Sequence, residues 1–409
     1  MKMRPFGRLV SASEALGRLL RETRPIQGTE VLPLAESVGR VSAQTLRAPR
    51  PIPAFRRATW DGYALRSRDL STARPSRPAV LRIVGEIHAE EIWRSPLRPG
   101  ETVAIATGAP LPVGADSVVL FEEVQVHGSS ISVPRPVPPG HAVAEAGEDF
   151  RRGDVLIHSG ERLTPARMGC VGASGWQTIR VYRQPRVGLL PNGNELVAPG
   201  KRLAPGRLHE FNNVTLSGLV RALGGVPVAR EPVPDDPKAL QDAIEALIEE
   251  CDLVVVTGGS SVGERDYLPV VFPRMGRLLF HGIRVRPGKP TLAVKVKGRL
   301  ILGMPGHPTS CLSNAYWLLR PVWARLSRQP WRDRVEEFPL GAPFQAPTRG
   351  FTTILPVRVQ GNRAFPTFRG SSAISSLAGA DGYAVLGWRP RGYARGTRVA
   401  VHWLDPPLR

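Results

Sequence analysis

Residues 253–263 read Leu253-Val254-Val255-Val256-Thr257-Gly258-Gly259-Ser260-Ser261-Val262-Gly263. An apolar run there leads directly into a glycine-rich loop. A second loop contains Arg286-Pro287-Gly288-Lys289-Pro290, and a third, 303–310, follows the apolar residues 300–302. Ligands of open α/β sheets collect at the carboxyl ends of strands, and such loops expose backbone N–H groups to anions. We therefore predict a site for a phosphorylated, anionic ligand.

Strands and helices alternate around these loops. Apolar runs predict strands at 187–190, 226–229 and 253–256, and helical periodicity predicts helices at 212–223, 239–250 and from 309 to 319 or beyond. Asp235-Asp236-Pro237 is a helix-start signal, Gly224-Gly225 is a stop, and Thr309 and Ser310 are cap candidates. The alternation predicts a mostly parallel sheet with helices on both faces.

The segments that flank this α/β region have a different sequence pattern. We predict short strands at 79–83, 102–106, 117–121, 124–126 and 131–133, separated by Pro and Gly, which indicates a small inserted β domain. Further strands beyond residue 335 predict a compact, barrel-like C-terminal β domain. Helices are expected at 11–23, with Ser11 and Glu14 in a capping box, and at 32–43. The predicted domains are 1–48 with 152–182, 49–151, 183–330 and 331–409.

Composition bounds the class of protein. The 409 residues are enough for two to four domains, and 42% of them are hydrophobic. We expect a cytoplasmic protein without a membrane partner, because no apolar run has spanning length and the start lacks a signal-peptide core. The three cysteines have neither metal-ligand nor disulfide spacing.

The formal charge of +20 raises the question of nucleic acid. Only six of the 55 basic side chains are lysines, and the arginines are scattered along the chain rather than clustered. We interpret this as a compositional bias and expect no nucleic-acid partner; a steep salt dependence of DNA binding would be needed to revive that reading. Within this bias, Lys289 in its Gly/Pro loop suggests a position that needs a compact charge.

Several carboxylates lie in turns, namely Asp61, Asp149, Glu195, Asp235 and Asp266. A single Asp beside Gly is usually a turn residue, but as a set near a phosphate loop these acids would suit Mg²⁺.

Three other side chains have both a structural and a functional interpretation. Thr107 is either an ordinary turn residue or a hydroxyl beside the ligand. His307 either packs its loop or contacts a phosphate. Ser310 fits a helix cap better than a nucleophile.

Taken together, the motifs resemble the molybdopterin molybdenumtransferase family, which includes bacterial MoeA and the E domain of gephyrin. The resemblance covers essentially the whole chain. The residues that carry it are Asp61-Gly62-Tyr63-Ala64, Thr107-Gly108-Ala109-Pro110, Gly147-Glu148-Asp149, Asn194-Glu195-Leu196, Asp235-Asp236-Pro237, the loop from Thr257 to Asp266-Tyr267, Pro287-Gly288-Lys289-Pro290 and Pro305-Gly306 with Pro308 and Ser310.

Membership implies a homodimer with four domains per subunit and a site between subunits. The α/β domain would be similar to MogA, the enzyme that adenylylates molybdopterin, and a molybdopterin adenylyltransferase is an implied partner. The implied reaction inserts molybdenum from molybdate into adenylylated molybdopterin, with Mg²⁺-assisted release of AMP.

The resemblance also implies roles for individual residues. Catalytic roles fall on Asp61, Thr107, Asp149 and Glu195. Metal ligands would be Glu195, Asp235 and Asp266. Contacts to the pterin and its phosphate would come from Gly258, Gly259, Ser260, Ser261, Gly263, Gly288, Lys289, Pro290, Pro305, Gly306, His307, Pro308 and Ser310.

The chain departs from the family pattern at Trp60, Ala144, Asn192, Asn194 and His307. These departures keep two alternatives open: a paralogue specialised for tungstate, and a weakened enzyme that acts as a molybdopterin-binding carrier.

Overall fold

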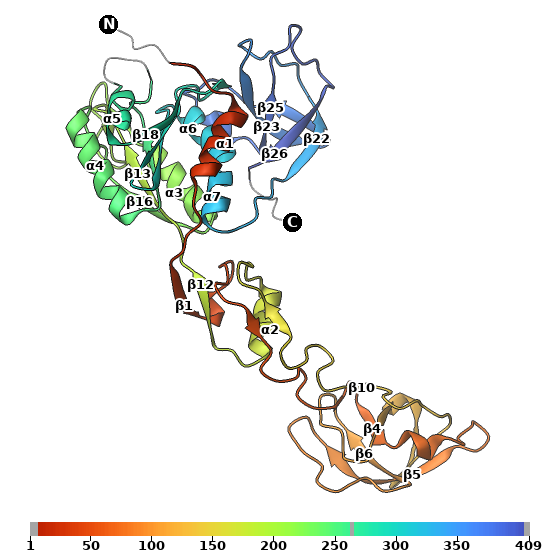
Figure 1. Ribbon diagram of the computed structural model, residues 1–409. Helices are drawn as coiled ribbons and strands as arrows, with labels where there is room; N and C mark the ends of the chain where they lie inside the picture. The colour runs from red at the N-terminus through yellow and green to blue at the C-terminus, as the bar shows by residue number, and fades with distance from the viewer. Residues whose placement is uncertain (1–6, 262–265, 405–409) are drawn as a thin grey trace. The chain divides into compact units, whose positions relative to one another are not determined.

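The computed structural model describes residues 7–261 and 266–404. The chain divides into two compact units. The large unit comprises the residues up to Glu30, Gly39–Val41 and everything from Val181 onward; the insert unit comprises Val31–Val38 and Ser42–Arg180. Figure 1 shows the elements of both units, and each is described here by itself.

A six-stranded sheet forms the centre of the large unit, in the order β16-β13-β17-β21-β20-β18. The first four strands are parallel, and β20 and β18 each run antiparallel to the preceding neighbour. The predicted mostly parallel sheet is therefore confirmed. The strand bounds are β16 Val226–Ala229, β13 Arg186–Pro191, β17 Leu253–Thr257, β21 Arg299–Met304, β20 Leu292–Val296 and β18 Arg277–His281.

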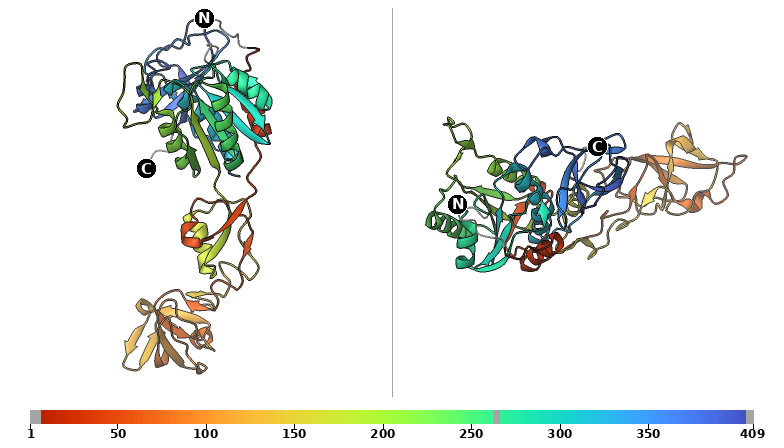
Figure 2. Two further views of the ribbon diagram at one scale, coloured as in Figure 1. Left: turned by 90° about the vertical axis from the view of Figure 1, so that its left-hand side faces the viewer. Right: turned by 90° about the horizontal axis from the view of Figure 1, so that it is seen from above.

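Helices cover both faces of this sheet, as the views in Figures 1 and 2 show. Alternate residues of β17 point to opposite sides: Val254 and Val256 pack with α4 and α5, whereas Leu253 and Val255 belong to the core that includes α1, α3 and α7. The helix bounds are α1 Ala12–Glu22, α3 Asn212–Ala222, α4 Pro237–Glu250, α5 Leu268–Met275, α6 Pro308–Asn314 and α7 Arg320–Leu326, with a π-helical turn Ala315–Leu319 between the last two.

The helix ends test the cap predictions. Ser11 caps α1 by accepting from the Glu14 backbone N–H at 3.1 Å, while the Glu14 carboxylate pairs with Arg18. Asp236 caps α4 through the Ala239 N–H at 2.7 Å. The cap prediction for Thr309 and Ser310 is wrong, because Pro308 already occupies the first turn and His307 is the cap residue.

A second sheet of the large unit, in the order β19-β23-β25-β26-β22, with β24 paired to β23, comes mostly from the C-terminal region. Leu340, just after β22, bridges to Ala364 in β24, so the sheet curls back on itself as expected for a barrel-like domain. Its strands are β19 Val285–Arg286, β22 Val335–Pro339, β23 Thr352–Gln360, β24 Arg363–Pro366, β25 Gly382–Leu386 and β26 Arg398–Trp403, and the short helix α8 spans Ser375–Ala378.

The insert unit contains a sheet in the order β7-β4-β6-β5-β9-β8, in which only β5 and β6 are parallel. The five strands predicted here are confirmed, and β4 is an additional one. Their bounds are β4 Gly62–Leu65, β5 Ala79–Ile87, β6 Glu101–Ile105, β7 Ser117–Leu120, β8 Gln125–His127 and β9 Ser130–Val133.

Short ribbons connect segments on either side of this sheet. Strand β2 (Leu46–Arg47) pairs with β11 (Val155–Ile157), and β3 (Arg57–Ala58) pairs with β10 (Val143–Ala144). Helix α2 (Pro165–Ala173) follows β11. Chain segments before and after the β sheet thus lie side by side, which agrees with the idea of an insertion, although the four predicted domain boundaries stay a prediction.

The helix predicted at 32–43 is wrong. Residues Thr29–Pro33 form strand β1, which pairs with β12 (Thr178–Tyr182), and only Leu34–Glu36 make a single 3₁₀ turn. The β-branched Thr29 and Val31 suit a strand, and Gly39 adopts φ of +77°, which breaks a helix. Pairing with a segment far along the chain overrode the local periodicity. Among the described residues, no helix is long and apolar enough to span a bilayer.

Candidate active site

Three loops meet at the carboxyl edge of the central sheet. The loop after β13 bonds to the end of β17, where the Asn192 N–H donates to the Thr257 carbonyl at 2.8 Å. The loop after β17 bonds to the end of β21, where the Gly258 N–H donates to the Met304 carbonyl at 3.1 Å. The loops 257–261 and 303–310, both singled out in the sequence, therefore lie side by side at this edge, together with the loop after β13.

The two glycines of the first loop are required by close backbone approach. Both adopt positive φ, +90° for Gly258 and +59° for Gly259. A Cβ at Gly258 would lie 2.2 Å from the Asn192 carbonyl oxygen, and one at Gly259 would lie 2.4 Å from Asn192 Oδ1. Asn192, one of the departures from the family pattern, is therefore packed against this loop and anchored by bonds from Nδ2 to the Val233 and Pro234 carbonyls.

Three predicted acids line one cavity at this edge, with a volume of about 440 Å³. Glu195 folds over Gly193, where a Cβ would lie 2.7 Å from its carboxylate oxygens. Asp235 and Asn194 are hydrogen-bonded to each other: the Asp235 backbone N–H donates to Asn194 Oδ1 at 3.1 Å. The third acid is Asp266, and the remaining walls come from Asn192, Gly193, Gly258, Gly259, Ser260, Ser261, Pro290, Pro305, Gly306 and His307.

A buried asparagine positions the Lys289 loop. Asn314 Nδ2 donates to the Gly288 carbonyl at 3.1 Å and to Thr291 Oγ1 at 2.6 Å, while Asn314 Oδ1 accepts from Trp317 Nε1 at 2.9 Å. Gly288 has φ of +110°, and a Cβ there would lie 2.4 Å from Asn314 Oδ1. The Lys289 carbonyl accepts from the Ile283 N–H, which ties the other side of the loop. Asn314 lies in no motif and was not predicted from the sequence.

The C-terminal sheet holds the same loop from outside. Strand β19 runs parallel to β23, with Val285 opposite Thr352 and Arg286 opposite Thr353. The Arg286 guanidinium also lies over the Phe351 ring, 5.4 Å from its centroid. The basic loop is therefore fixed between the α/β sheet and the C-terminal sheet.

A second cavity of about 640 Å³ adjoins the first and shares Ser261, Pro290, Pro305 and His307 with it. Arg286 and Lys289 line this second cavity together with Ser310. Its apolar walls include Phe344, Pro347, Ile354 and Phe368. The cleft thus has an acidic compartment next to one that is basic and apolar.

His307 lies where the two compartments join. Its Nδ1 is 3.2 Å from Ser371 Oγ, and the Ser371 carbonyl accepts from the Thr309 N–H at 3.1 Å. The Gly306 carbonyl accepts from Asn212 Nδ2 at 2.9 Å. The wall residues from the C-terminal domain were missed from the sequence, since no local motif marks them. Gly263 lies outside the described residues.

The other predicted catalytic residues belong to the insert unit. Asp61 Oδ1 accepts from both the backbone N–H of Thr107 at 2.7 Å and its hydroxyl at 2.9 Å. These bonds, the backbone one first, hold the pKa of the Asp61 carboxyl below its usual value. Trp60 beside it is 60% exposed. Asp149 is also exposed, and its N–H donates to the Ile52 carbonyl at 3.0 Å.

Family models match three stretches of the chain. They are described as the MoeA N-terminal region, domains I and II (residues 10–175), a probable molybdopterin binding domain (192–325) and the MoeA C-terminal region, domain IV (339–404). The fold and cleft accordingly define a multidomain protein with an α/β domain of the molybdopterin-binding class.

Individual relatives agree. A molybdopterin molybdenumtransferase of Bacillus subtilis is 30% identical over 389 residues, covering 91% of this chain and 89% of the relative. One of Synechococcus elongatus is 34% identical over 324 residues, covering 77% and 80%. The crystal structure of a molybdopterin biosynthesis MoeA protein from a Pyrococcus species has a TM-score of 0.85 at 32% identity, covering 98% of this chain and 100% of that one. This chain belongs to the molybdopterin molybdenumtransferase family.

Proposed function

We propose that this protein inserts molybdenum from molybdate into adenylylated molybdopterin and releases AMP with the assistance of Mg²⁺. The observation that carries the proposal is the two-compartment cleft. The basic and apolar compartment suits a flat pterin ring with a phosphate, because Lys289 and Arg286 supply charge and Phe344 and Phe368 supply apolar walls. The acidic compartment suits a metal ion at the phosphoanhydride.

The donor set fits Mg²⁺ carried by a phosphate. Mg²⁺ commonly binds through one or two carboxylates plus water and substrate phosphates. Glu195, Asp235 and Asp266 line the acidic compartment and would supply those carboxylates. In the described part of the chain, no three His, Cys, Asp or Glu side chains form a ready-made metal cluster. The bound ion would neutralise charge on the departing phosphate.

The chain's own residues would position the substrate. Gly258 and Gly259 allow their loop to approach a phosphate closely, and Lys289 would pair with its charge. His307, between the compartments, could donate a hydrogen bond to the bridging region of the substrate. Asp61, ionised and oriented by its hydrogen bonds from Thr107, would contact the reacting part of the substrate together with Asp149.

We propose that the working form is a cytoplasmic homodimer in which Asp61, Thr107 and Asp149 of a second copy complete the site. A molybdopterin adenylyltransferase would supply the substrate. Both ideas rest on the family resemblance.

The test is AMP release by the purified full chain supplied with adenylylated molybdopterin, molybdate and Mg²⁺. Asp61→Asn and Glu195→Gln should each lower the rate at least a hundredfold while the melting temperature stays unchanged. Glu245→Gln, an exposed carboxylate on α4, is the matched control and should retain full activity. Wild-type turnover in Asp61→Asn and Glu195→Gln would remove both residues from the mechanism.

A second candidate is a tungstate-specialised or weakened paralogue that carries molybdopterin. Asn194 favours it, because an amide hydrogen-bonded to Asp235, a wall residue of the acidic compartment, supplies less negative charge than a carboxylate. The curated relatives carry the name of the transferase, which supports the enzyme over the carrier. Tight molybdopterin binding without AMP release would support the carrier.

A further inference from the structure

A separate cavity of about 390 Å³ lies at the opposite edge of the central sheet. Its walls come from the segment after α1, from the starts of β17 and β21 and from the β20–β21 hairpin. The candidate active site lies at the other end of β17, whose five residues span on the order of 15 Å. Neither the reaction nor the family resemblance assigns a role to this cavity.

The charged side chains around the cavity do not balance. Five cations line it (Arg24, Arg183, Lys295, Lys297 and Arg299), against only two acids (Glu22 and Asp252). Carboxylates just outside the cavity could neutralise this excess positive charge. The ion-pair partner of each charged side chain therefore determines whether the cavity is positively charged.

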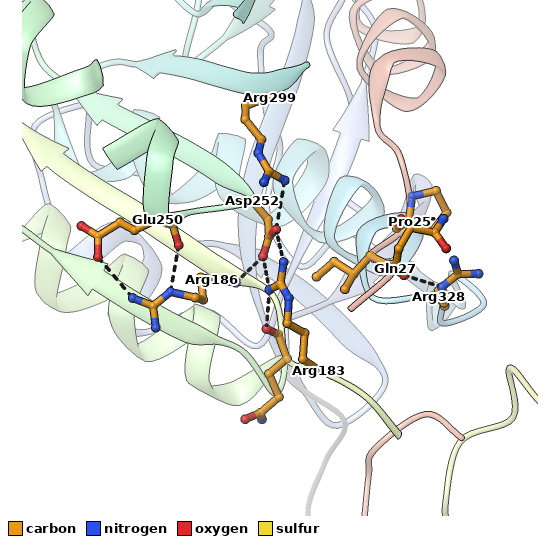
Figure 3. A network of polar contacts seen from close by, with 10 residues as sticks. Pro25, Gln27, Arg183, Arg186, Glu250, Asp252, Arg299 and Arg328 are labelled. Atoms are coloured by element: carbon orange, nitrogen blue, oxygen red, sulfur yellow. Dashed lines mark hydrogen bonds and ion pairs between the residues drawn. The ribbon is translucent and has the colours of Figure 1, made fainter. Parts of the chain in front are cut away.

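Asp252 is fully engaged within the cluster. Its side chain is 3% exposed, and its oxygens accept from the two terminal nitrogens of Arg183 at 2.7 and 2.6 Å and from Arg299 at 3.2 Å (Figure 3). The backbone N–H of Arg186 donates to it as well, at 2.9 Å. One carboxylate thus serves two guanidinium groups, which leaves a net positive charge.

The second acid of the lining, Glu22, is paired with a side chain outside the cavity. Glu22 pairs with Arg277, outside the cavity lining, at 2.6 Å, and Lys297 pairs with Glu249 at 2.9 Å. Arg24 and Lys295 have no carboxylate within ion-pair distance among residues 7–261 and 266–404. Arg24 is exposed, and Lys295 is half-buried with its Nζ donating to the Glu22 carbonyl. Neither cation therefore forms an ion pair in the described part of the chain, and the nearby carboxylate of Glu22, which acts on both, is already paired with Arg277.

The lowered pKa of Lys295 agrees with an excess of positive charge around this cavity. Burial lowers the pKa of its ammonium group first, and the positive charges of Arg24, Arg277 and Arg299 lower it further against the opposing effect of Glu22. A bound anion would relieve that repulsion. Two guanidinium groups and an ammonium around one polar cavity suit phosphate oxygens, which accept charge-assisted hydrogen bonds.

We infer that this cavity is a second anion site, distinct from the candidate active site, which binds a dianionic phosphate group through Lys295 and Arg24 beside the Arg183–Asp252–Arg299 cluster. The ligand is either inorganic phosphate or a small phosphomonoester, for which the cavity has room. A bound phosphate would join the segment after α1 to the β20–β21 hairpin. The inference does not depend on the proposed reaction.

The test is calorimetric titration of the full-length protein with inorganic phosphate and, separately, with AMP at constant ionic strength. Lys295→Gln and Arg24→Gln should each weaken one phosphate site at least tenfold. Arg24 is exposed, so its replacement keeps the test valid if Lys295→Gln fails to fold. Lys238→Gln is the matched control, because this lysine is 83% exposed on α4 and its loss changes the net charge equally.

Lys289→Gln separates the two sites. We expect it to weaken phosphate binding at the candidate active site and to leave the second site intact. Weakening of phosphate alone by Arg24→Gln would identify free phosphate as the ligand, and weakening of AMP as well would identify a phosphomonoester. Equal affinities in Arg24→Gln, Lys295→Gln and Lys238→Gln, or loss of all phosphate binding in Lys289→Gln, would overturn the inference.

Discussion

Asn314, fully buried at the end of α6, donates a hydrogen bond to the carbonyl oxygen of Gly288, 3.1 Å away, on the loop that carries Lys289. The shape of the basic compartment therefore depends on a side chain outside every glycine-rich motif. An amide is needed here because the position both donates, to Gly288 and Thr291, and accepts, from Trp317.

Replacement of this amide should loosen the loop. Asn314→Leu leaves the Trp317 N–H and a Thr291 acceptor unpaired, and we expect a loss of about 2–4 kcal/mol in the free energy of unfolding, since each buried unpaired group costs about 1–3 kcal/mol. Urea denaturation would measure it. The neighbouring Ser313→Ala is the control, because Ser313 Oγ is buried with no hydrogen-bond partner in the described part of the chain. Similar losses in the two variants would refute the special role of Asn314.

The glycine-rich loop offers a test with opposite signs. Gly258→Ala should destabilise the protein by more than about 2 kcal/mol, because positive φ is unfavourable and the new Cβ would meet the Asn192 carbonyl. Gly218→Ala inside α3 meets no atom within 4 Å and should stabilise by about 0.5–1 kcal/mol. Thermal denaturation of both variants would check this; a tolerated Gly258→Ala would mean that the two loops are not in close contact.

The buried carboxylate of Asp252 should contribute strongly to stability at neutral pH. Burial by itself would raise its pKa, but the bonds from Arg183 and the Arg186 N–H and the nearby positive charges lower it overall. Asp252→Asn should cost about 1–3 kcal/mol, because the buried side chain loses charge-assisted hydrogen bonds from two guanidinium groups that are themselves partly exposed. Asp242→Asn is the control, because it breaks only an exposed pair with Lys238 and should change stability by less than about 1 kcal/mol.

The pH dependence of this effect has a defined sign. A carboxylate whose pKa is lowered by folding stabilises the native state above its unfolded pKa, near about 3.9, and the contribution disappears as the pH falls through the lower folded value. The difference in urea midpoint between wild type and Asp252→Asn should therefore be largest near pH 7 and shrink below about pH 4. A difference that grows on acidification would contradict the assignment.

The Asp61–Thr107 pair can be tested by NMR titration of the Asp61 carboxyl carbon. Thr107→Val removes the hydroxyl donor and keeps the backbone N–H, which is the larger cause of the lowered pKa. The pKa of Asp61 should rise in this variant but stay below the usual value of about 3.9. Thr107→Ser keeps both donors and should titrate like wild type. The same pKa in Thr107→Val and Thr107→Ser would show that the hydroxyl does not contribute.

Local sequence signals predicted most of the α/β domain. The Asp236 cap, the Gly224 stop and the fully buried apolar strand β17 all follow from neighbouring residues. The segment 32–43 failed because its strand depends on pairing with β12, about 150 residues away along the chain, which local periodicity does not report.

The same limit applies to the site. Gly-rich loops and turn acids are visible as motifs, so Gly258, Lys289 and Asp235 could be proposed directly. Asn314 and Ser371 could not, since an Asn inside a helix or a Ser in a loop carries no signal until the fold brings it to Gly288 or His307. The pairing of β19 with β23, which places the C-terminal domain against the basic loop, was equally invisible.

A single-turnover reaction tests the central claim most directly. The purified full chain would be mixed with adenylylated molybdopterin, Mg²⁺ and either molybdate or tungstate, and both AMP release and metal retained on the pterin would be followed. The account predicts AMP release coupled to metal incorporation with molybdate. Tight binding of the adenylylated substrate without AMP release or metal incorporation would contradict it.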